Sequence, residues 1–217
     1  MAAPKHGGPH PGLLVFQEIF GVNVHIRDVT ERFAAEGYLA VAPELFHRTA
    51  PGFECAYEDL ETAWQQRSEM TEEGVAADVR AAWQWLQDAA LCDRARTAAL
   101  GFCMGGTVAF ATACTVGVKA AVSFYGGAIA QTLLGRVPDL QAPVLLFWGG
   151  LDRHIKVEHT RAVVDALREH GKPHVNVEFS DADHGFFCDR RGTYHPAAAR
   201  KAWVLTLEFL KTHLEGG

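Results

Sequence analysis

The stretch from Thr97 to Ala113 reads TAALGFCMGGTVAFATA, with one cysteine at its centre. Residues 97–102 have the composition of a buried strand, and the small and apolar residues 107–113 have the pattern of a helix. Between them, Cys103 lies in a turn whose flanking glycines leave room for a sharp bend of the backbone. A side chain on such a strand–turn–helix junction is exposed, and enzymes place a nucleophile there. The stretch therefore predicts a nucleophilic thiol.

Strand-length apolar runs alternate with helical patterns along the rest of the chain. Besides 97–102, the predicted strands are residues 13–17, 39–42, 120–125, 144–148 and 175–179. Helices are predicted from the spacing of Ile26, Val29 and Phe33, after a capping Thr71, and over residues 157–170 and 197–214. This alternation is typical of an α/β protein with a mostly parallel sheet covered by helices on both faces. We expect about six strands and a single domain over residues 1–217, because no linker or repeat divides the chain.

The composition is that of a globular protein rather than of a nucleic-acid binder. Hydrophobic residues make up 48% of the chain and the formal net charge is −6, so no basic surface is expected. The basic pair Arg190-Arg191 is interpreted as part of a solvated loop. The five cysteines lack C-x-x-C spacing, and the N-terminus does not resemble a signal peptide. These features predict reduced thiols in a cytoplasmic protein.

Two segments need a separate interpretation. Residues 98–118 carry no charge and are long enough to span a bilayer, but their pattern changes from strand to helix halfway. We interpret them as a strand and a helix at the centre of the sheet, without membrane contact. Residues 43–70 are the least regular part of the chain. They are either a lid or pocket wall over the carboxyl ends of the strands, or a plain surface excursion.

A thiol needs a partner to become an efficient nucleophile, because only a few per cent of it is thiolate at neutral pH. A histidine can take the proton, and a carboxylate can orient the histidine. Asp152 closes one predicted strand and His184 follows another, which gives the order nucleophile, acid, histidine of the α/β-hydrolases. Asp181 and Asp183 are rival acids, but they are too close in sequence to His184 to reach its far nitrogen. Together, Cys103, Asp152 and His184 predict a catalytic triad.

The chemistry also requires donors for the oxyanion of the tetrahedral intermediate. One expected donor is the backbone N–H of Met104, the residue after the nucleophile, and the other is at about Ile19, in the loop after residues 13–17. No metal or other cofactor is expected. His154 and His159 lack zinc-ligand spacing, and no dinucleotide or phosphate-binding fingerprint occurs.

Two motifs give the chain a resemblance to one enzyme family over nearly its whole length. Residues 17–23 read QEIFGVN and residues 101–106 read GFCMGG. With the predicted triad, they are similar to the dienelactone hydrolases, also called carboxymethylenebutenolidases, of the α/β-hydrolase superfamily. The resemblance implies that the triad opens the lactone ring of a dienelactone to give maleylacetate, in aromatic-compound degradation. It also implies that Glu18 lies near the thiol and takes its proton when substrate arrives, whereas on its own Glu18 reads as a strand-end carboxylate facing water.

By the same resemblance, four aromatic side chains are expected as pocket walls, with core packing as the alternative for each. They are Phe20, Tyr57, Tyr125 and Phe186. The substrate is expected to be a small lactone or ester, with no nucleic-acid or membrane partner.

The sequence departs from the family pattern in the pocket. Members that act on dienelactone usually have an arginine four residues after the histidine, where this chain has Cys188, and often a serine directly after it, where this chain has Gly185. Arg48 and Arg67 are the nearby choices for a second substrate arginine. A guanidinium clamps a carboxylate with two hydrogen bonds, so its loss makes neutral esters an alternative substrate class. A hydrolase fold kept as a non-catalytic binding module is a third hypothesis.

The family pattern begins with strands ahead of the first one predicted here. Only twelve residues precede Leu13, so we expect those early antiparallel strands to be missing. A sheet edge left bare tends to recruit a partner. The chain is therefore expected to be a monomer or a homodimer, with this edge as the possible contact.

Overall fold

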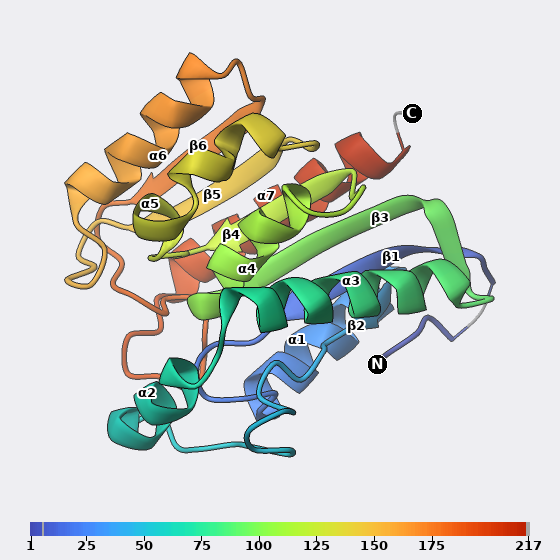
Figure 1. Ribbon diagram of the computed structural model, residues 1–217, viewed down its shortest axis with the longest axis horizontal. Helices are drawn as coiled ribbons and strands as arrows, with labels where there is room; N and C mark the ends of the chain where they lie inside the picture. Colours follow the sequence, from blue (N-terminus) through green and yellow to red (C-terminus); the bar gives the residue numbers. More distant parts are fainter. Residues whose placement is uncertain (6, 216–217) are drawn as a thin grey trace.

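The computed structural model describes residues 1–5 and 7–215. Six strands form one sheet in the order β2-β1-β3-β4-β5-β6, and each neighbouring pair is parallel (Figure 1). The strands are β1 (His10–Phe16), β2 (Leu39–Val41), β3 (Cys92–Phe102), β4 (Ala120–Phe124), β5 (Val144–Gly149) and β6 (His174–Phe179). Each predicted strand corresponds to one of these, so the prediction of a six-stranded α/β sheet is confirmed.

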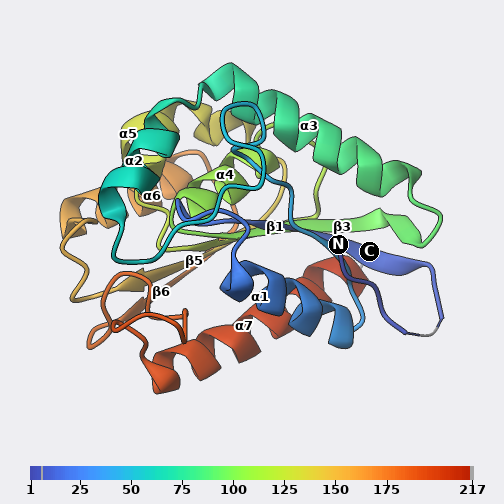
Figure 2. The same cartoon turned by 90° about the horizontal axis from the view of Figure 1, so that it is seen from below.

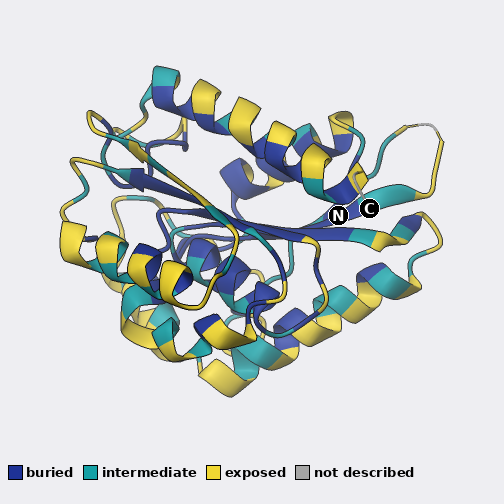
Figure 3. Cartoon of the chain, turned by 90° about the horizontal axis from the view of Figure 1, so that it is seen from above, coloured by how far each residue is buried: buried dark blue, intermediate teal, exposed yellow. Residues whose placement is uncertain are grey.

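Helices cover both faces of the sheet. On one face lie α1 (Val24–Ala35) and α7 (Pro196–Glu215), and on the other lie α3 (Glu72–Asp88), α4 (Met104–Ala113) and α6 (Val157–Glu169) (Figure 2). The shorter segments are α2 (Leu60–Ser68), α5 (Ile129–Thr132) and the 3-10 helix η1 (Leu134–Asp139). The central strands are buried between these layers, and the helices expose their outer sides (Figure 3). Burial on both faces explains why the strands read as continuous apolar runs.

Of the two segments that needed a separate interpretation, residues 98–118 match the prediction and residues 43–70 contain a helix that was not predicted. Residues 98–118 form the end of β3 and then α4, as predicted, and within the described residues no helix is long and apolar enough to cross a membrane. Residues 43–70 contain α2, which the sequence does not predict because only Ala63 of this helix is buried and no apolar stripe marks it. The predicted cap at Thr71 is confirmed, since its hydroxyl oxygen accepts a hydrogen bond from the Gly74 N–H at 3.0 Å.

The outer edge of β2 is partly covered by the chain itself. The backbone N–H and C=O groups of Ala2 exchange hydrogen bonds of 2.8 and 2.9 Å with those of Ala40, in an antiparallel bridge. The expectation of a bare edge is therefore wrong at this position, because these groups of β2 already have a partner. These two groups of β2 are therefore not available to pair with a second copy of the chain.

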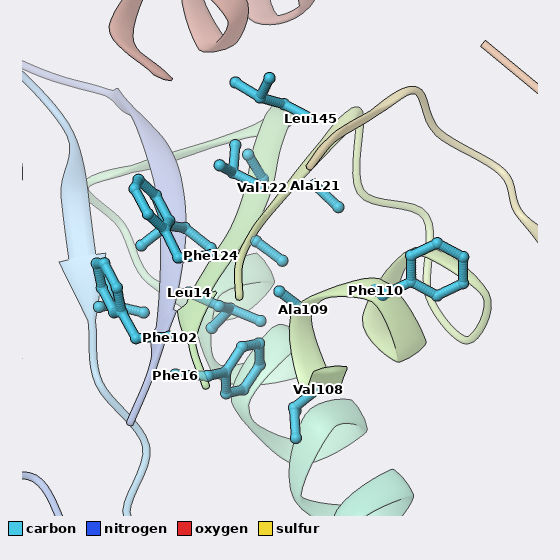
Figure 4. Close-up of a cluster of buried hydrophobic side chains, with 14 of the residues drawn as sticks. Leu14, Phe16, Phe102, Val108, Ala109, Phe110, Ala121, Val122, Phe124 and Leu145 are labelled. Carbon is cyan, nitrogen blue, oxygen red and sulfur yellow. The ribbon is translucent and has the colours of Figure 1, made fainter. Parts of the chain in front are cut away.

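Phenylalanine rings fix the carboxyl ends of the central strands relative to one another. Phe102, Phe124 and Phe147 lie in register on β3, β4 and β5, with ring centroids 4.8 and 4.6 Å apart. Phe187, from the loop after β6, packs on Phe102 and Phe124 at 5.2 and 4.9 Å. Figure 4 shows Ala109 of α4 on the other side of these strands. This packing holds together the strand ends that carry the candidate site.

Candidate active site

Cys103 occupies the junction of β3 and α4 with a φ of +54°, a left-handed conformation that residues other than glycine rarely adopt. The glycines that follow allow this turn to pack closely. A Cβ on Gly105 would clash with the carbonyl oxygen of Phe16, and one on Gly106 would lie 2.5 Å from the carbonyl oxygen of Phe124. The turn is therefore wedged between the ends of β1 and β4, which explains why the sequence requires glycine there.

His184 and Asp152 lie beside the thiol. Nδ1 of His184 is 2.7 Å from Oδ2 of Asp152, whose side chain is almost completely buried. The other oxygen, Oδ1, accepts hydrogen bonds from the backbone N–H of His154 at 2.7 Å and of Ile155 at 3.0 Å. Negative charge on Cys103 raises the pKa of His184, so the ring lies close enough to the sulfur to respond to its charge. The carboxylate is thus held in place and in turn orients the ring.

The charges of these side chains support one another. Burial lowers the pKa of His184, but negative charge on Cys103 once its thiol is deprotonated, together with the hydrogen bond to Asp152, outweighs burial and raises this pKa to about 10. Burial raises the pKa of Asp152, whereas its hydrogen bond to His184 and the charge of that ring lower it, and the net shift is downward. This environment holds a proton on the imidazole and a negative charge on the carboxylate.

The backbone brings the two expected oxyanion donors to neighbouring segments. Met104 begins α4, so its N–H has no partner within the helix. Gly105 packs directly on the carbonyl oxygens of Phe16 and Gln17, and the loop with Ile19 follows these two residues. The N–H of Ile19 makes no hydrogen bond to any other residue that the structure describes. Both N–H groups are therefore available to a ligand near the turn.

Glu18 is completely buried rather than facing water. Its Oε1 accepts a hydrogen bond from Nη1 of Arg191 at 3.0 Å, and its Oε2 has no partner within residues 1–5 and 7–215. The Arg191 side chain is only 16% exposed, and its guanidinium lies 5.5 Å from the ring centroids of both Phe20 and Tyr57. The interpretation of the Arg190-Arg191 pair as solvated is therefore wrong for Arg191, a site residue that the sequence analysis missed.

The departures from the family pattern are connected to Arg191. Gly185 has a φ of +77°, and a Cβ at this position would clash with the guanidinium of Arg191. Cys188 is completely buried and donates a hydrogen bond from its sulfur to the Tyr57 hydroxyl at 3.2 Å. An arginine is thus present beside Glu18, but it comes from position 191 rather than 188. In the sequence, Gly185 directly after His184 is the feature that indicates close packing of another side chain, here Arg191, at this position.

The two arginines considered from the sequence have other surroundings. Arg48 pairs with Asp78 of α3, and Arg67 lies in the last turn of α2. Among the described residues, neither pairs with Glu18 or with a member of the predicted triad. All five cysteines are free thiols.

The four aromatic residues suggested by the resemblance surround the site from two sides. The ring centroid of Tyr125 is 4.9 Å from that of His184, and Phe186 packs on Tyr125 at 5.4 Å. Phe20 and Tyr57 pack edge to face at 4.7 Å. Phe20, Tyr125 and Phe186 are almost completely buried, and Tyr57 is partly exposed. Tyr57 is therefore the member of this group with surface left for a ligand.

Comparison with known proteins places this site in a family. The sequence model of the dienelactone hydrolase family matches residues 1–214. A Synechocystis sp. protein named "Putative carboxymethylenebutenolidase" is 35% identical over 224 residues, which cover 99% of this chain and 91% of that protein. The chain belongs to the dienelactone hydrolase family. As a family member with ester-hydrolysing relatives, it is an ester hydrolase, and the hypothesis of a non-catalytic module is not supported.

Solved structures of dienelactone hydrolases have the same fold. The crystal structure of a "Putative Dienelactone Hydrolase" from Klebsiella pneumoniae has a TM-score of 0.88 and 35% identity, covering 96% of this chain and 90% of that chain. A dienelactone hydrolase-like promiscuous phosphotriesterase, P91, from metagenomic libraries has a TM-score of 0.85 and 25% identity, covering 96% and 88%. The match extends over nearly the entire length of each protein, so this dienelactone hydrolase family member has the α/β-hydrolase fold that its motifs predict.

Proposed function

We propose that this hydrolase uses Cys103 as a nucleophile to open a small lactone or cleave a small ester. The observation that carries the proposal is the 2.7 Å hydrogen bond between His184 and Asp152, together with the position of Cys103 on a left-handed turn, where a negative charge on its sulfur raises the pKa of His184. Side chains arranged in this way can activate a nucleophile, transfer its proton and stabilise the charge that develops. All three come from the carboxyl ends of parallel strands, where α/β enzymes bind their ligands.

In the proposed reaction, the sulfur of Cys103 attacks the carbonyl carbon and a tetrahedral intermediate forms. The backbone N–H groups of Ile19 and Met104 stabilise its oxyanion. Collapse of the intermediate breaks the C–O bond, and His184 gives a proton to the leaving oxygen. The thioester is then hydrolysed by water that His184 deprotonates, which releases the acid and leaves Cys103 as a thiolate. The proton held by Glu18 then returns to the sulfur and restores the thiol. In a lactone the leaving oxygen stays on the acyl chain, so the product is one open-chain hydroxy acid or its keto form.

Glu18 is proposed to take part in activating the thiol. Its Oε2 is buried without a hydrogen-bond partner among the described residues, which is energetically costly for a carboxylate. A thiol proton is a group that satisfies this oxygen, while Arg191 holds Oε1. Glu18 therefore serves as the acceptor of the Cys103 proton when substrate binds, and Arg191 holds the carboxylate in position.

Arg191 favours a substrate that carries a carboxylate. Its guanidinium is fixed by Glu18 and by the rings of Phe20 and Tyr57, and N–H groups that do not face Glu18 can bind a second carboxylate. A dienelactone, which combines a lactone with a carboxylate, has both features, and its opening gives maleylacetate. A neutral ester is the second candidate, because Cys188 replaces the arginine of the family pattern at its usual position.

The test of the nucleophile uses p-nitrophenyl acetate and the Cys55→Ser variant as background, because Cys55 is a second partly exposed thiol. Stoichiometric carboxamidomethylation of Cys103 by iodoacetamide is expected to abolish turnover, and Cys103→Ala is expected to lower kcat by roughly 10³-fold or more. The Cys55→Ser background itself should retain full activity. Full turnover by protein that is completely alkylated at Cys103 would refute the proposal.

A further inference from the structure

A second group of reactive side chains lies outside the proposed triad. It consists of His25 of α1 and of Cys188 and Asp189 from the loop after β6. One ligand atom of each residue, a ring nitrogen, the sulfur and a carboxylate oxygen, lies within 4.8 Å of the other two. Nδ1 of His25 is 3.8 Å from Oδ1 of Asp189. The three side chains therefore converge on one point from two separate segments of the chain.

His25 is the unusual member of this group. Its side chain is only 1% exposed, and neither ring nitrogen has a hydrogen-bond partner in the part of the chain that the structure describes. The ring is enclosed by Phe102 and Phe187, whose centroids lie 5.8 and 6.2 Å from its own. A buried polar group without a partner is costly, and it calls for an explanation. An imidazole nitrogen is a common ligand of transition metals, and a metal ion would give this ring the partner it lacks among the described residues.

We propose that His25, Cys188 and Asp189 form a binding site for Zn²⁺ or a similar divalent transition metal. An imidazole nitrogen, a thiolate and a carboxylate are all ligands of zinc, and a set of three leaves a fourth position for water. No family motif in the sequence indicates such a site, because the residues lie far apart and lack zinc-ligand spacing.

The geometry and the charges suit a small divalent ion. Zinc bonds of about 2.0–2.3 Å place tetrahedral ligand atoms roughly 3.5 Å apart, so the cluster has to contract by about 1 Å. Asp189, whose side chain is 52% exposed, has the freedom to make this movement. A thiolate and a carboxylate together neutralise the ion, and Glu18 nearby is already paired with Arg191.

Metal binding changes one hydrogen bond in the site. In the metal-free protein the thiol of Cys188 donates a hydrogen bond to the Tyr57 hydroxyl at 3.2 Å. When the metal binds, the sulfur–metal bond replaces the S–H bond and the proton passes to solvent.

The test measures metal binding directly and excludes the active-site thiol. Cys103→Ser protein is titrated with Co²⁺, whose absorption shows a thiolate-to-metal charge-transfer band and the visible bands of tetrahedral coordination. We expect one equivalent to bind with both signals, and Zn²⁺ to displace it. Cys103→Ser/Cys188→Ser should lose the charge-transfer band. Asp189→Asn, a change at an exposed residue, should weaken binding by roughly 10-fold or more, while Cys103→Ser/Cys55→Ser should bind unchanged.

The outcomes separate the proposal from its alternatives. Absence of the charge-transfer band in Cys103→Ser protein would overturn it, as would a band that survives Cys188→Ser. A band that appears only when Cys103 is present would mean that the metal binds the triad instead. His25→Gln, checked for folding by circular dichroism, should reduce affinity as Asp189→Asn does. Because the readout is absorption and not turnover, failure here leaves the proposed hydrolysis untouched.

Discussion

Arg191 shows how one side chain can determine the character of the candidate site. Burial lowers its pKa, but the charge of Glu18 and of other anionic groups raises it above the ordinary value, so it stays protonated beside a fully buried carboxylate. Removing one partner of such a pair leaves an unpaired buried charge, at a cost of about 3–5 kcal/mol. The pair therefore has a structural role as well as the proposed role in substrate binding.

Changing Arg191 should alter substrate preference more than catalysis in general. The double variant Glu18→Gln/Arg191→Met removes both charges together, and Glu18→Gln alone is its reference. Compared with this reference, we expect kcat/KM of the double variant for an acidic dienelactone to be about 10- to 100-fold lower. The value for an uncharged ester should fall much less. Steady-state kinetics on the two substrates measures this difference, with Arg190→Met as the exposed control. Equal losses on both substrates would show that Arg191 does not bind the substrate carboxylate.

The residues of the site differ in how far the sequence reveals them. Cys103, Asp152 and His184 each follow a predicted strand, and parallel strands end at the same edge of a sheet, so their convergence could be predicted. Arg191 could not be predicted, because its contact with Glu18 depends on the path of the irregular loop after β6. A basic residue in a loop is usually solvated. The glycine at position 185, where a side chain would clash with the Arg191 guanidinium, was the sequence feature consistent with a buried arginine.

At the scale of elements, the junction between β3 and α4 positions the nucleophile. Gly105 lets the first turn of α4 touch the backbone of Phe16 and Gln17, and Gly106 lets it touch β4. The left-handed backbone of Cys103 is imposed by these contacts, because a strained residue persists only where its surroundings enforce it. Close packing of helix and strands is thus part of the proposed catalytic device.

Gly105→Ala should therefore damage both stability and activity. The added Cβ would collide with backbone carbonyls that cannot move without shifting β1. We therefore expect the free energy of unfolding to fall by about 1–3 kcal/mol. Gly117→Ala is the matched control, since a Cβ there meets nothing within 4 Å. Urea denaturation of the two variants measures the effect. Equal stability of both would contradict the close packing described here.

The elements themselves were largely readable from the sequence. Strands buried on both faces give long apolar runs, and the amphipathic helices α1, α3 and α6 give periodic ones. The helix α2 has no such signal, because only Ala63 is buried and the other residues of this helix are partly or fully exposed. Its existence depends on capping by Asp59 and on contacts of the surrounding loop, which a hydrophobic pattern does not reveal.

On the scale of the whole molecule, the sheet couples the proposed triad to folding. His184 and Asp152 come from different strands, and their pKa values shift only when the sheet assembles. For His184 the folded pKa is raised, so its stabilising contribution is complete below the unfolded value of 6.5 and is lost as pH rises toward about 10. For Asp152 the folded pKa is lowered, so its contribution is present above 3.8 and is lost in stronger acid.

The stability of the protein should follow this linkage. The Tm of the wild type minus the Tm of His184→Gln is expected to decrease as pH rises from 6.5 toward 10, because the stabilising contribution of His184 is lost over this range. Differential scanning calorimetry across this range measures it, with the exposed His170→Gln as control. A difference that stays constant with pH would show that His184 does not hold its proton more firmly in the folded state.

The most direct measurement of the proposed mechanism is the identity of the acylated residue. Wild-type protein is mixed with excess p-nitrophenyl acetate, quenched in acid during turnover, digested and analysed by mass spectrometry. We predict one acetyl group on the peptide that contains Cys103, bound as a thioester that hydroxylamine removes, and its accumulation in His184→Gln, where deacylation lacks its base. An acetyl group on any other residue, or turnover without acetylation of Cys103, would contradict nucleophilic catalysis by this sulfur.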